Sequence, residues 1–593
     1  MMAPLQAEAL DISFKLLPAI IVFLMMASFL VIGFVFKVAD AEGMWVAGRG
    51  IGNIENGMAI GANWMSAASY LGLAGLVALS GFYGLAFIVG WTTGYFVLLI
   101  FLAAQMRRFG KYTAPDFVAD RFNSPMARAL AAFTTLLIAY VYSVGQARGM
   151  GLVGQYVFGL DIVPMIVVMM TITVGYLALS GMLGATKNMA VQYVILIVAF
   201  LAGVYVVGFS QGYSTILPQI EYGALFSELS RQFSEPFIGG SGYYLWVATA
   251  FSLIFGTCGL PHVLVRFYTV KNERTARWST VSGLFFIMLL YWAAPAMAAF
   301  GVDLFAAVNG ISPDAVYSGQ QAMSGAEGDV IVVLAAQFAD LPRWFVGLVA
   351  AGGMAAAIAT TAGLFITASS AVAHDIYSEL INPDATQRQQ VLIGRATIVG
   401  IGALVTVTAF NPPALIGELV AYAFSLAGTV LFPMFFLGLW WENTNRQGAL
   451  AGMTVGLLLW ITSIINSVLP AYVGFLADVA GGSGQAIIPI YAQYVPPIGA
   501  ALVGTPLVFL VTIAVSMATP EPPLETKRMV RQCHSPEPMG QQQTAEDIVA
   551  DGGEEMAADG GRAADDGTAD GGRATDDAAA EGDRADDGTT EGR

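Results

Sequence analysis

The stretch NGMAIGANWMSAASYLGLAGLVALSG, residues 56–81, is long and apolar enough to cross a lipid bilayer, yet glycine and polar residues dilute it from end to end. Hydrocarbon offers no hydrogen-bond partners, so a spanning segment must pair its backbone groups internally as a helix. Irregular backbone is tolerated at that depth only where it is buried in protein or lines a cavity. The stretch therefore predicts a spanning helix that is either interrupted halfway or packed closely through its small residues.

The rest of the chain shares this apolar character. Hydrophobic residues make up 56% of its 593 positions and charged residues 11%, which is charge-poor for a soluble protein. A hydrocarbon core ~30 Å thick needs about 20 helical residues to cross it, and about thirteen stretches reach that length. The predicted fold class is an all-α integral membrane protein. The expected spans are roughly 16–38, 55–80, 82–105, 128–159, 162–182, 189–210, 244–263, 280–300, 329–373, 394–410, 413–440, 447–468 and 497–517.

Basic residues orient these spans. Lys and Arg gather in alternate gaps between the apolar stretches, as at Arg107 and Arg108. Cytoplasmic loops carry the excess of positive charge, so a multi-pass protein of the cell membrane is predicted, with the N-terminus outside and the C-terminus in the cytoplasm. We expect a short extracellular N-terminus at 1–15, a transmembrane domain at 16–518 and an acidic, disordered cytoplasmic tail at 519–593.

The acidic balance of the chain, a formal charge of −16, is concentrated in its tail. After Gly540 the sequence is low in complexity and rich in Asp, Glu, Gly and Ala. Such a segment buries too little apolar area to offset its ordering entropy, so we expect disorder there, with a solubilising role or a regulatory, partner-binding one. The expected partners are the lipid bilayer and small solutes, and no nucleic acid. The oligomeric state is not predicted.

Two motifs resemble those of enzymes without their usual context. Residues 149–154, GMGLVG, match G-x-G-x-x-G but lie in an apolar helical run and follow no strand. This context argues against a dinucleotide-binding site. His374 and Asp375 resemble part of a catalytic dyad, yet no nucleophile is near and they mark a helix end. No Walker motif is present. We expect no enzyme and no cofactor, and any transport must use an ion gradient or the gradient of the substrate itself.

A second helix-breaking cluster is GTCGLPHVLVRF, residues 256–267. Pro261 lacks an N–H group and so frees a carbonyl of the preceding turn. His262 lies beside this break. It is either a proton-relay or substrate-contacting residue, or a structural histidine paired with a neighbouring carbonyl.

A third cluster is AAAIATTAGLFITASSAVAHDIY, residues 355–377, in which hydroxyl residues interrupt a small-residue helix. Hydroxyls such as that of Thr360 are suited to complete a cation site opposite the first cluster. The alternative is that they hydrogen-bond back to their own helix. The second and third clusters lie in different halves of the chain, as in transporters built from inverted repeats, so the clusters together favour a secondary transporter.

Arg148 lies inside the fourth span, close to Gln146. A charge within the membrane costs several kcal/mol unless a partner or the interface relieves it. Facing a central cavity, its guanidinium fork would suit a carboxylate. The alternative is an arginine that reaches the external interface, since it lies about 20 residues into an inside-to-outside helix.

These clusters resemble the sodium/solute symporter family, and most closely its acetate-permease branch. The resemblance covers about 45–518. It implies a LeuT-like fold of two inverted five-helix repeats with broken helices. The motifs that carry it are GNIENGMAIGANWMSAASYLGLAG at 52–75, RRFGKYTAPDFVADRF at 107–122, GTCGLPHVLVRFYTV at 256–270, SSAVAHDIY at 369–377 and GLWWENTNRQGALAGMTVG at 438–456.

The resemblance implies a sodium site between the second and ninth spans. Its ligands look like the carbonyls of Ala62, Met65 and Ala356 and the hydroxyl of Thr360. Sodium-coupled members often carry Ser where this chain has Ala359, so one hydroxyl ligand is missing. Thr361 or water is the substitute to consider, and coupling to protons stays open as an alternative.

The resemblance also implies a substrate site beside the same breaks. An anion is expected because Arg148 stands where the acetate-permease branch usually has an apolar residue, and because Asn63 stands where related chains often have Asp. The expected substrate-binding residues are Ser66, Ser69, Gln146, Arg148, Pro261 and His262.

The resulting hypothesis is a cation-coupled symporter, most simply driven by Na⁺, that imports a short-chain monocarboxylate such as acetate by alternating access. One alternative is a Na⁺-coupled symporter of proline or another amino acid, because Arg148 suits any carboxylate. Another is a transporter-like sensor that signals through its tail. A third is a passive channel, which would not accumulate its substrate against a gradient.

Overall fold

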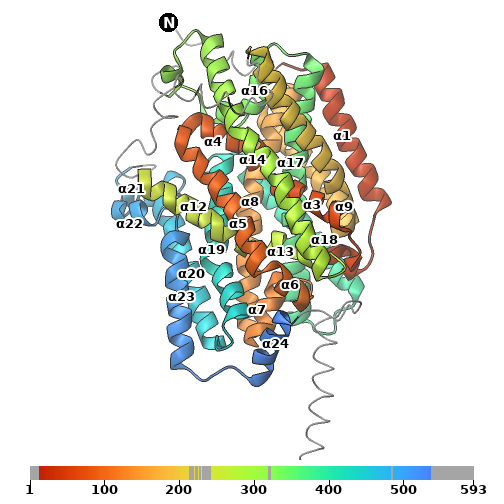
Figure 1. Ribbon diagram of the computed structural model, residues 1–593, viewed down its shortest axis with the longest axis vertical. Coiled ribbons are helices and arrows are strands. Elements are labelled where there is room, and N and C mark those ends of the chain that lie inside the picture. Colours follow the sequence, from red (N-terminus) through yellow and green to blue (C-terminus); the bar gives the residue numbers. More distant parts are fainter. Residues whose placement is uncertain are drawn as a thin grey trace, which may run out of the picture. The chain divides into compact units, whose positions relative to one another are not determined.

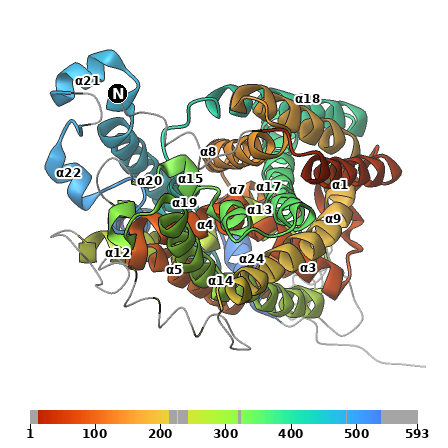
Figure 2. The same cartoon turned by 90° about the horizontal axis from the view of Figure 1, so that it is seen from above.

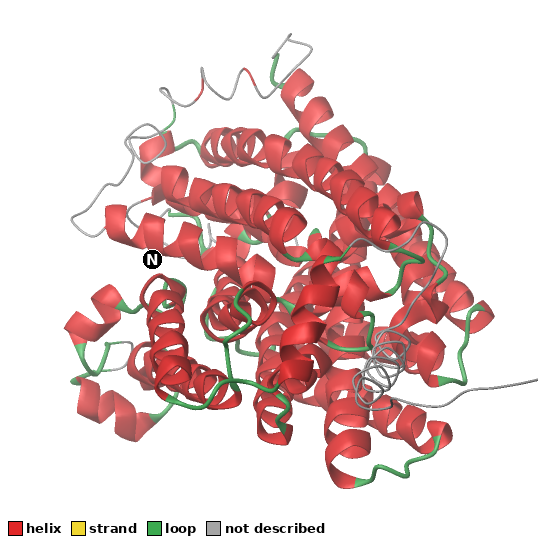
Figure 3. Cartoon of the chain, turned by 60° about the horizontal axis from the view of Figure 1, so that its bottom comes forward, coloured by secondary structure: helices red, strands yellow, loops and turns green. Residues whose placement is uncertain are grey.

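The computed structural model describes residues 13–212, 242–317, 322–482 and 485–535, together with Ile220, Leu225 and Leu229. The described residues form helices joined by short loops, without a strand (Figures 1 and 3). This confirms the all-α prediction. It agrees with the requirement that segments within hydrocarbon pair their backbone groups internally.

The helices up to residue 309 are α1 (Leu16–Val35), α2 (Ala41–Val46), α3 (Asn53–Trp64), α4 (Leu73–Ser80), α5 (Leu85–Phe101), α6 (Ala103–Phe109), α7 (Ala114–Phe122), α8 (Pro125–Phe158), α9 (Ile162–Ser210), α12 (Gly242–Gly259), α13 (Pro261–Tyr268) and α14 (Glu273–Asn309). Those that follow are α15 (Gly325–Gly328), α16 (Ile331–Phe338), α17 (Arg343–Ser370), α18 (Gln387–Thr408), α19 (Ile416–Trp440), α20 (Arg446–Ser467), α21 (Gly474–Ala480), α22 (Pro489–Tyr494), α23 (Ala501–Ala518) and α24 (Leu524–His534). Short 3₁₀ and π turns are η2 (Ala47–Arg49), η3 (Ala68–Gly72), η4 (Gly81–Gly84), η5 (Pro313–Tyr317), η6 (Ala371–Ile381) and η7 (Leu469–Ala471).

Eleven helical segments of the described chain are long and apolar enough to cross a membrane, against about thirteen stretches expected. The difference lies in two long segments, Ala68–Phe101 and Ile162–Ser210. Each contains a glycine with positive φ, Gly81 at 56° and Gly181 at 54°. A side chain at such a φ would be strained, so glycine allows the sharp turn there. Each segment therefore comprises two of the expected stretches.

Helix α17 forms the centre of the bundle. Its most apolar window is entirely buried, and α1, α3, α8, α9, α13 and α18 pack around it (Figure 2). By contrast, the apolar windows of α1, α18, α20 and α23 are at most 39% buried. Large side chains such as Phe23, Leu392 and Leu510 are more than half exposed on these helices. An apolar surface of this extent on the outer helices is suited to contact with lipid acyl chains.

Close helix approach depends on glycine at the contact between α12 and α19. A Cβ atom on Gly259 would lie 2.3 Å from the carbonyl oxygen of Ala427, and one on Gly256 would lie 2.4 Å from that of Phe424. Because these contacts are to backbone atoms, no side-chain movement can relieve them. Small residues at such points let two backbones approach closely.

Basic residues at one end of the bundle serve as helix caps. Arg121 of α7 is fully buried and donates hydrogen bonds to the carbonyls of Gly438, Trp441, Glu442 and Thr444. These carbonyls lie in the last turn of α19 and just after it, where the helix lacks internal partners and its dipole is negative. Arg121, at the same end of the bundle as Arg107 and Arg108, thus stabilises the packing of α7 against the end of α19.

The ordered chain continues past the boundary predicted at 518. Helix α24 lies within the tail and buries Cys533, whose carbonyl accepts a hydrogen bond of 2.8 Å from Arg108 of α6. His534 Nε2 lies 2.8 Å from the carbonyl oxygen of Leu439. The loss of hydropathy after Pro520 therefore marks the end of the last span and not the end of the packed chain. The acidic repeats lie outside the described residues, so disorder there stays a prediction.

Substitution of Gly259 by Ala is expected to destabilise the protein by about 1–3 kcal/mol, the usual cost of overpacking. The physical reason is the 2.3 Å approach of the added Cβ to a backbone oxygen of α19. The measurement is the apparent melting temperature of purified protein in detergent. Gly175→Ala is the matched control, because a Cβ there meets nothing within 4 Å. Equal melting temperatures for the two variants would contradict the prediction.

Candidate functional site

The first cluster, residues 56–81, forms a broken helix, which is one of the two structures that its sequence predicts. Helix α3 ends at Trp64, and Met65 takes the non-helical angles φ −73° and ψ 71°. The N–H of Ser66 donates to the carbonyl of Trp64 and not to Ala62 four residues earlier. Likewise the N–H of Ser69 donates to Ser66 and not to Met65. The carbonyls of Ala62 and Met65 are thus released from regular helical bonding.

Gln146 of α8 caps the second half of this broken helix. Its Oε1 accepts a hydrogen bond of 2.8 Å from the N–H of Ala67, just before η3. The side chain is fully buried. Its Nε2 has no partner among the described residues. Gln146 therefore stabilises the break through Oε1, and its Nε2 is left for another hydrogen-bond acceptor.

The second cluster is also a break. Helix α12 ends at Gly259, Leu260 is extended, and Pro261 occupies the first turn of α13, where a missing N–H costs nothing. Asn63 joins the two breaks, because its Nδ2 lies 3.3 Å from the carbonyl oxygen of His262 and donates to it.

The third cluster meets the first through Thr360 of α17. The hydroxyl of Thr360 donates a 2.8 Å hydrogen bond to the carbonyl of Asn63, which lies between the two released carbonyls in sequence. Thr361 instead bonds back to the carbonyl of Ala357 in its own helix, as the alternative reading predicts. Ala356 lies one turn from Thr360 on the same face of α17. Carbonyl and hydroxyl oxygens are the ligands that a hard cation prefers.

Several buried polar atoms around the breaks have no hydrogen-bond partner among the described residues. They are Asn63 Oδ1, Gln146 Nε2 and both ring nitrogens of His262. Leaving a buried polar group unpaired costs about 1–3 kcal/mol, so unpaired groups that gather in one place indicate a site for a polar ligand or water. The prediction that a neighbouring carbonyl satisfies His262 is therefore wrong.

Aromatic rings surround these polar atoms. Tyr142 lies edge-on to His262 with ring centroids 5.4 Å apart, and Phe424 of α19 lies 5.8 Å from Tyr142. Trp64 lies 5.4 Å from the same Phe424. Ser69 shares a 2.9 Å hydrogen bond with the hydroxyl of Tyr291 on the far side of the break. A few convergent polar groups between aromatic walls are typical of small-molecule sites.

Arg148 is placed differently from Gln146. It is half-buried, and its Nη1 donates a 3.3 Å hydrogen bond to the carbonyl of Phe410, just beyond the end of α18. Two residues along a helix turn the side chain by about 200°, so the two residues of α8 face different neighbours. The structure brings together Ser66, Ser69, Gln146, Pro261 and His262, whereas Arg148 lies apart from them.

His374 and Asp375 belong to a buried ion network and not to a catalytic dyad. Arg128 Nη1 lies 2.7 Å from Asp116 Oδ1 and 3.2 Å from Asp375 Oδ1, and His374 Nε2 lies 3.0 Å from the same oxygen of Asp116. Burial raises the pKa of Asp116, but His374 and Arg128 outweigh it and hold that pKa below its ordinary value. The arginine supplies the positive charge that the two carboxylates need.

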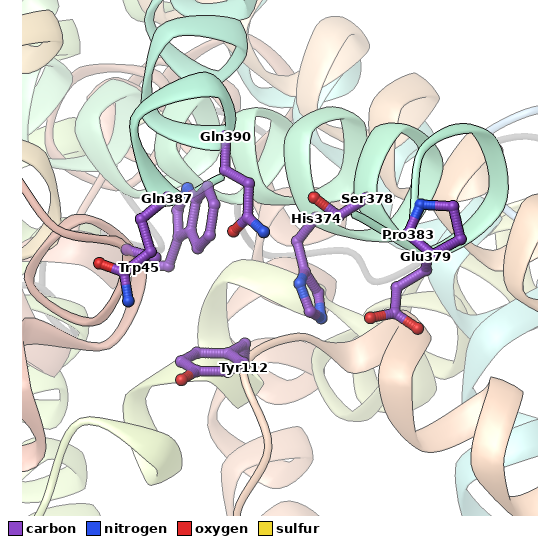
Figure 4. A pocket seen from close by; sticks show the side chains of 9 residues that line it. Trp45, Tyr112, His374, Ser378, Glu379, Pro383, Gln387 and Gln390 are labelled. Atoms are coloured by element: carbon purple, nitrogen blue, oxygen red, sulfur yellow. The ribbon is translucent and has the colours of Figure 1, made fainter. Parts of the chain in front are cut away.

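A cavity of about 300 Å³ lies next to this network (Figure 4). Its walls come from α2, the loop before α7, η6 and the start of α18. It lies at the end of the bundle that carries the basic caps, since Tyr112 on its wall follows Arg108 closely in sequence. Its lining residues are Ala41, Trp45, Tyr112, His374, Ser378, Glu379, Pro383, Gln387 and Gln390.

Comparison with known proteins identifies the family. Residues 44–456 match the model of the sodium:solute symporter family. The chain belongs to this family. It is 31% identical to an uncharacterised symporter of Bacillus subtilis over 75% of this chain and 84% of that protein. It is 30% identical to a monocarboxylic acid transporter of Corynebacterium glutamicum, over 80% of this chain and 85% of that one.

A solved structure shares the fold of this symporter. The chain superposes on a Na⁺-coupled sialic acid symporter in a substrate-bound, outward-open state with a TM-score of 0.63, covering 86% of this chain and 99% of that one at 15% identity. This confirms the LeuT-like fold class. Family and fold together identify a multi-pass membrane transporter and not an enzyme.

Two residues of the site were not among the predicted site residues. Asn63 was noted only for its difference in charge from related chains, yet it contacts both breaks and α17. Tyr142 precedes Gln146 by one helical turn, and this spacing is the signal that places it on the same face.

Substitution of Gln146 by Met is expected to lower the stability by about 1–3 kcal/mol, because the buried N–H of Ala67 loses its acceptor. The apparent melting temperature in detergent is the measurement. Ser143→Ala on the same helix is the control, since this buried hydroxyl has no partner among the described residues. An unchanged melting temperature for Gln146→Met would show that the cap is not needed.

Proposed function

We propose that this symporter is driven by Na⁺ and imports a short-chain monocarboxylate by alternating access. The observation that carries the proposal is that the breaks after α3 and before α13 lie next to each other. Released carbonyls, the hydroxyl of Thr360 and unpaired buried polar atoms gather around them. Broken helices near the midplane expose carbonyl oxygens to coupling ions and helix ends to substrates.

The proposed sodium ligands are the carbonyls of Ala62, Met65 and Ala356 and the hydroxyl of Thr360. Support comes from the loss of the regular bonds to Ala62 and Met65 and from the reach of Thr360 across to α3. A hydroxyl that donates to Asn63 retains lone pairs for a cation. Ala359 supplies no hydroxyl, so we infer weaker sodium binding than a serine there would give.

The proposed substrate contacts are Ser66, Ser69, Gln146, Pro261 and His262, with Asn63 and Tyr142 added from the structure. The monocarboxylic acid transporter among the relatives supports a carboxylate, with acetate as the first candidate. Unpaired N–H groups of Gln146 and His262 are suited to a carboxylate oxygen. Arg148 is proposed to act on the anion from the end of the bundle that is predicted to face outside.

Substitution of Thr360 by Val is expected to raise the half-saturating Na⁺ concentration at least tenfold, since about 1.4 kcal/mol of lost binding gives that factor. Thr361→Val is the control, because this hydroxyl bonds within its own helix. Ala359→Ser is expected to lower the same concentration by adding a ligand. The measurement is Na⁺-dependent substrate uptake. A Thr360→Val variant with normal Na⁺ dependence would contradict the proposed cation site.

The transport proposal is tested by uptake of labelled acetate into proteoliposomes at fixed pH and clamped voltage, first with an inward Na⁺ gradient and then with K⁺ in its place. We expect concentrative uptake only with Na⁺. If the two ligands are coupled by about 1–3 kcal/mol, each tightens the binding of the other by about 5- to 150-fold. Absence of acetate uptake, or competition by proline, would redirect the assignment to another carboxylate such as an amino acid.

A further inference from the structure

Asp329 is a buried carboxylate at the end of the bundle opposite the basic caps. It lies in the short linker between α15 and α16. Its Oδ2 lies 3.4 Å from the N–H of Ile416 and accepts a hydrogen bond from it at the start of α19. A helix N-terminus favours a negative charge, so this contact stabilises the ionised form.

Arg148 binds the other end of the loop between α18 and α19, which runs from Ala409 to Leu415. Arg148 donates a hydrogen bond to Phe410 near the start of this loop, and Asp329 accepts one from Ile416 just after its end. Arg148 lies twenty residues after Arg128 on α8, about 30 Å along the helix axis. Within the described chain its guanidinium donates this single hydrogen bond, which leaves N–H groups for another acceptor.

The segment that carries Asp329 lies against the far half of the first broken helix. A Cβ atom on Gly75 of α4 would lie 2.4 Å from the carbonyl oxygen of Gly328. A Cβ atom on Gly72 would lie 3.2 Å from the N–H nitrogen of Gly417. Asp329 therefore lies where η3 and α4 approach the start of α19.

Burial is the main cause of a shift in the pKa of Asp329, and neighbouring groups modify this shift. Burial raises the pKa of Asp329 to about 7. The hydrogen bond from Ile416 opposes this rise, Glu418 on α19 adds to it, and Arg148 on α8 opposes it. These are the charged groups of the neighbouring helices that act on this carboxylate.

We propose that Asp329 is a positioning residue that competes with the substrate carboxylate for Arg148. The inference rests on the proposed carboxylate substrate. When Asp329 is ionised, its negative charge acts on Arg148 and opposes the binding of a second anion there. When Asp329 is protonated, the guanidinium is available to an incoming anion. Lower external pH therefore strengthens anion binding, independently of any proton that is transported.

The test measures the KM and kcat of labelled acetate uptake at external pH 6 and 8 in proteoliposomes with fixed internal pH, voltage and Na⁺ gradient. Acetate is almost wholly ionised at both values, so its own titration contributes little. In the unmodified protein we expect KM to be at least about fivefold lower at pH 6, the lower end of typical coupling between linked sites. We expect kcat to change less.

Three variants separate the proposal from a merely structural role. Asp329→Asn is expected to show the low KM at both pH values, and Arg148→Gln a high KM at both. Asp340→Asn is the matched control, because it removes an exposed carboxylate at the end of α16 and should keep the behaviour of the unmodified protein.

A pH-dependent KM that persists in Asp329→Asn would overturn the competition while leaving the proposed function intact. Absence of acetate uptake by the unmodified protein at both pH values would overturn the proposed substrate, and with it the competition.

Discussion

The backbone hydrogen bonds that two broken helices give up inside a bilayer are the constraint on which this structure depends. Lipid offers no hydrogen-bond partners there, so side chains of the protein or a bound ligand must replace them. Gln146 accepts a hydrogen bond from the N–H of Ala67, and Thr360 donates one to the carbonyl of Asn63. The side chain of Asn63 donates to the carbonyl of His262, beside the second break. These three side chains come from different helices, so the breaks persist only while those helices stay packed together.

The same contacts explain how a cation and a solute can be linked. Asn63 and Thr360 connect the released carbonyls of α3 to the central helix α17, and Asn63 also contacts the break before α13. In the proposed mechanism, a ligand that binds the oxygens at one break would change the arrangement of the atoms at the other through these contacts. Two ligands that favour the same arrangement then strengthen each other, which is the thermodynamic content of symport.

Charge is used differently at the two ends of the bundle. At the basic end, Arg121 and Arg128 are saturated by helix carbonyls and buried carboxylates, so they stabilise the packing and are not free to bind a solute. At the other end, Arg148 is half-buried with a single hydrogen bond within the described chain, and Asp329 lies near it. In the first arrangement each arginine is held by several acceptors. In the second arrangement Arg148 keeps N–H groups for another acceptor, and the proposed competition concerns which anion acts on them.

The sequence by itself determined the class of molecule and the places where its helices break. Apolar length predicts the spans, and proline and glycine at 256–267 predict an interruption, because both follow from local chemistry in hydrocarbon. At 56–81 the sequence predicts either an interruption or close packing, and the structure shows the interruption. Hydropathy predicted span boundaries near Gly81 and Gly181 but not the backbone angles of the turns there, because it measures composition and not backbone angle. It also did not predict the packed helix α24. Only the tertiary structure decided that Gln146 faces the breaks while Arg148 turns toward Phe410, and that His262 has no carbonyl partner. The physical reason is that such contacts join residues far apart in the chain, and their geometry depends on how the helices pack.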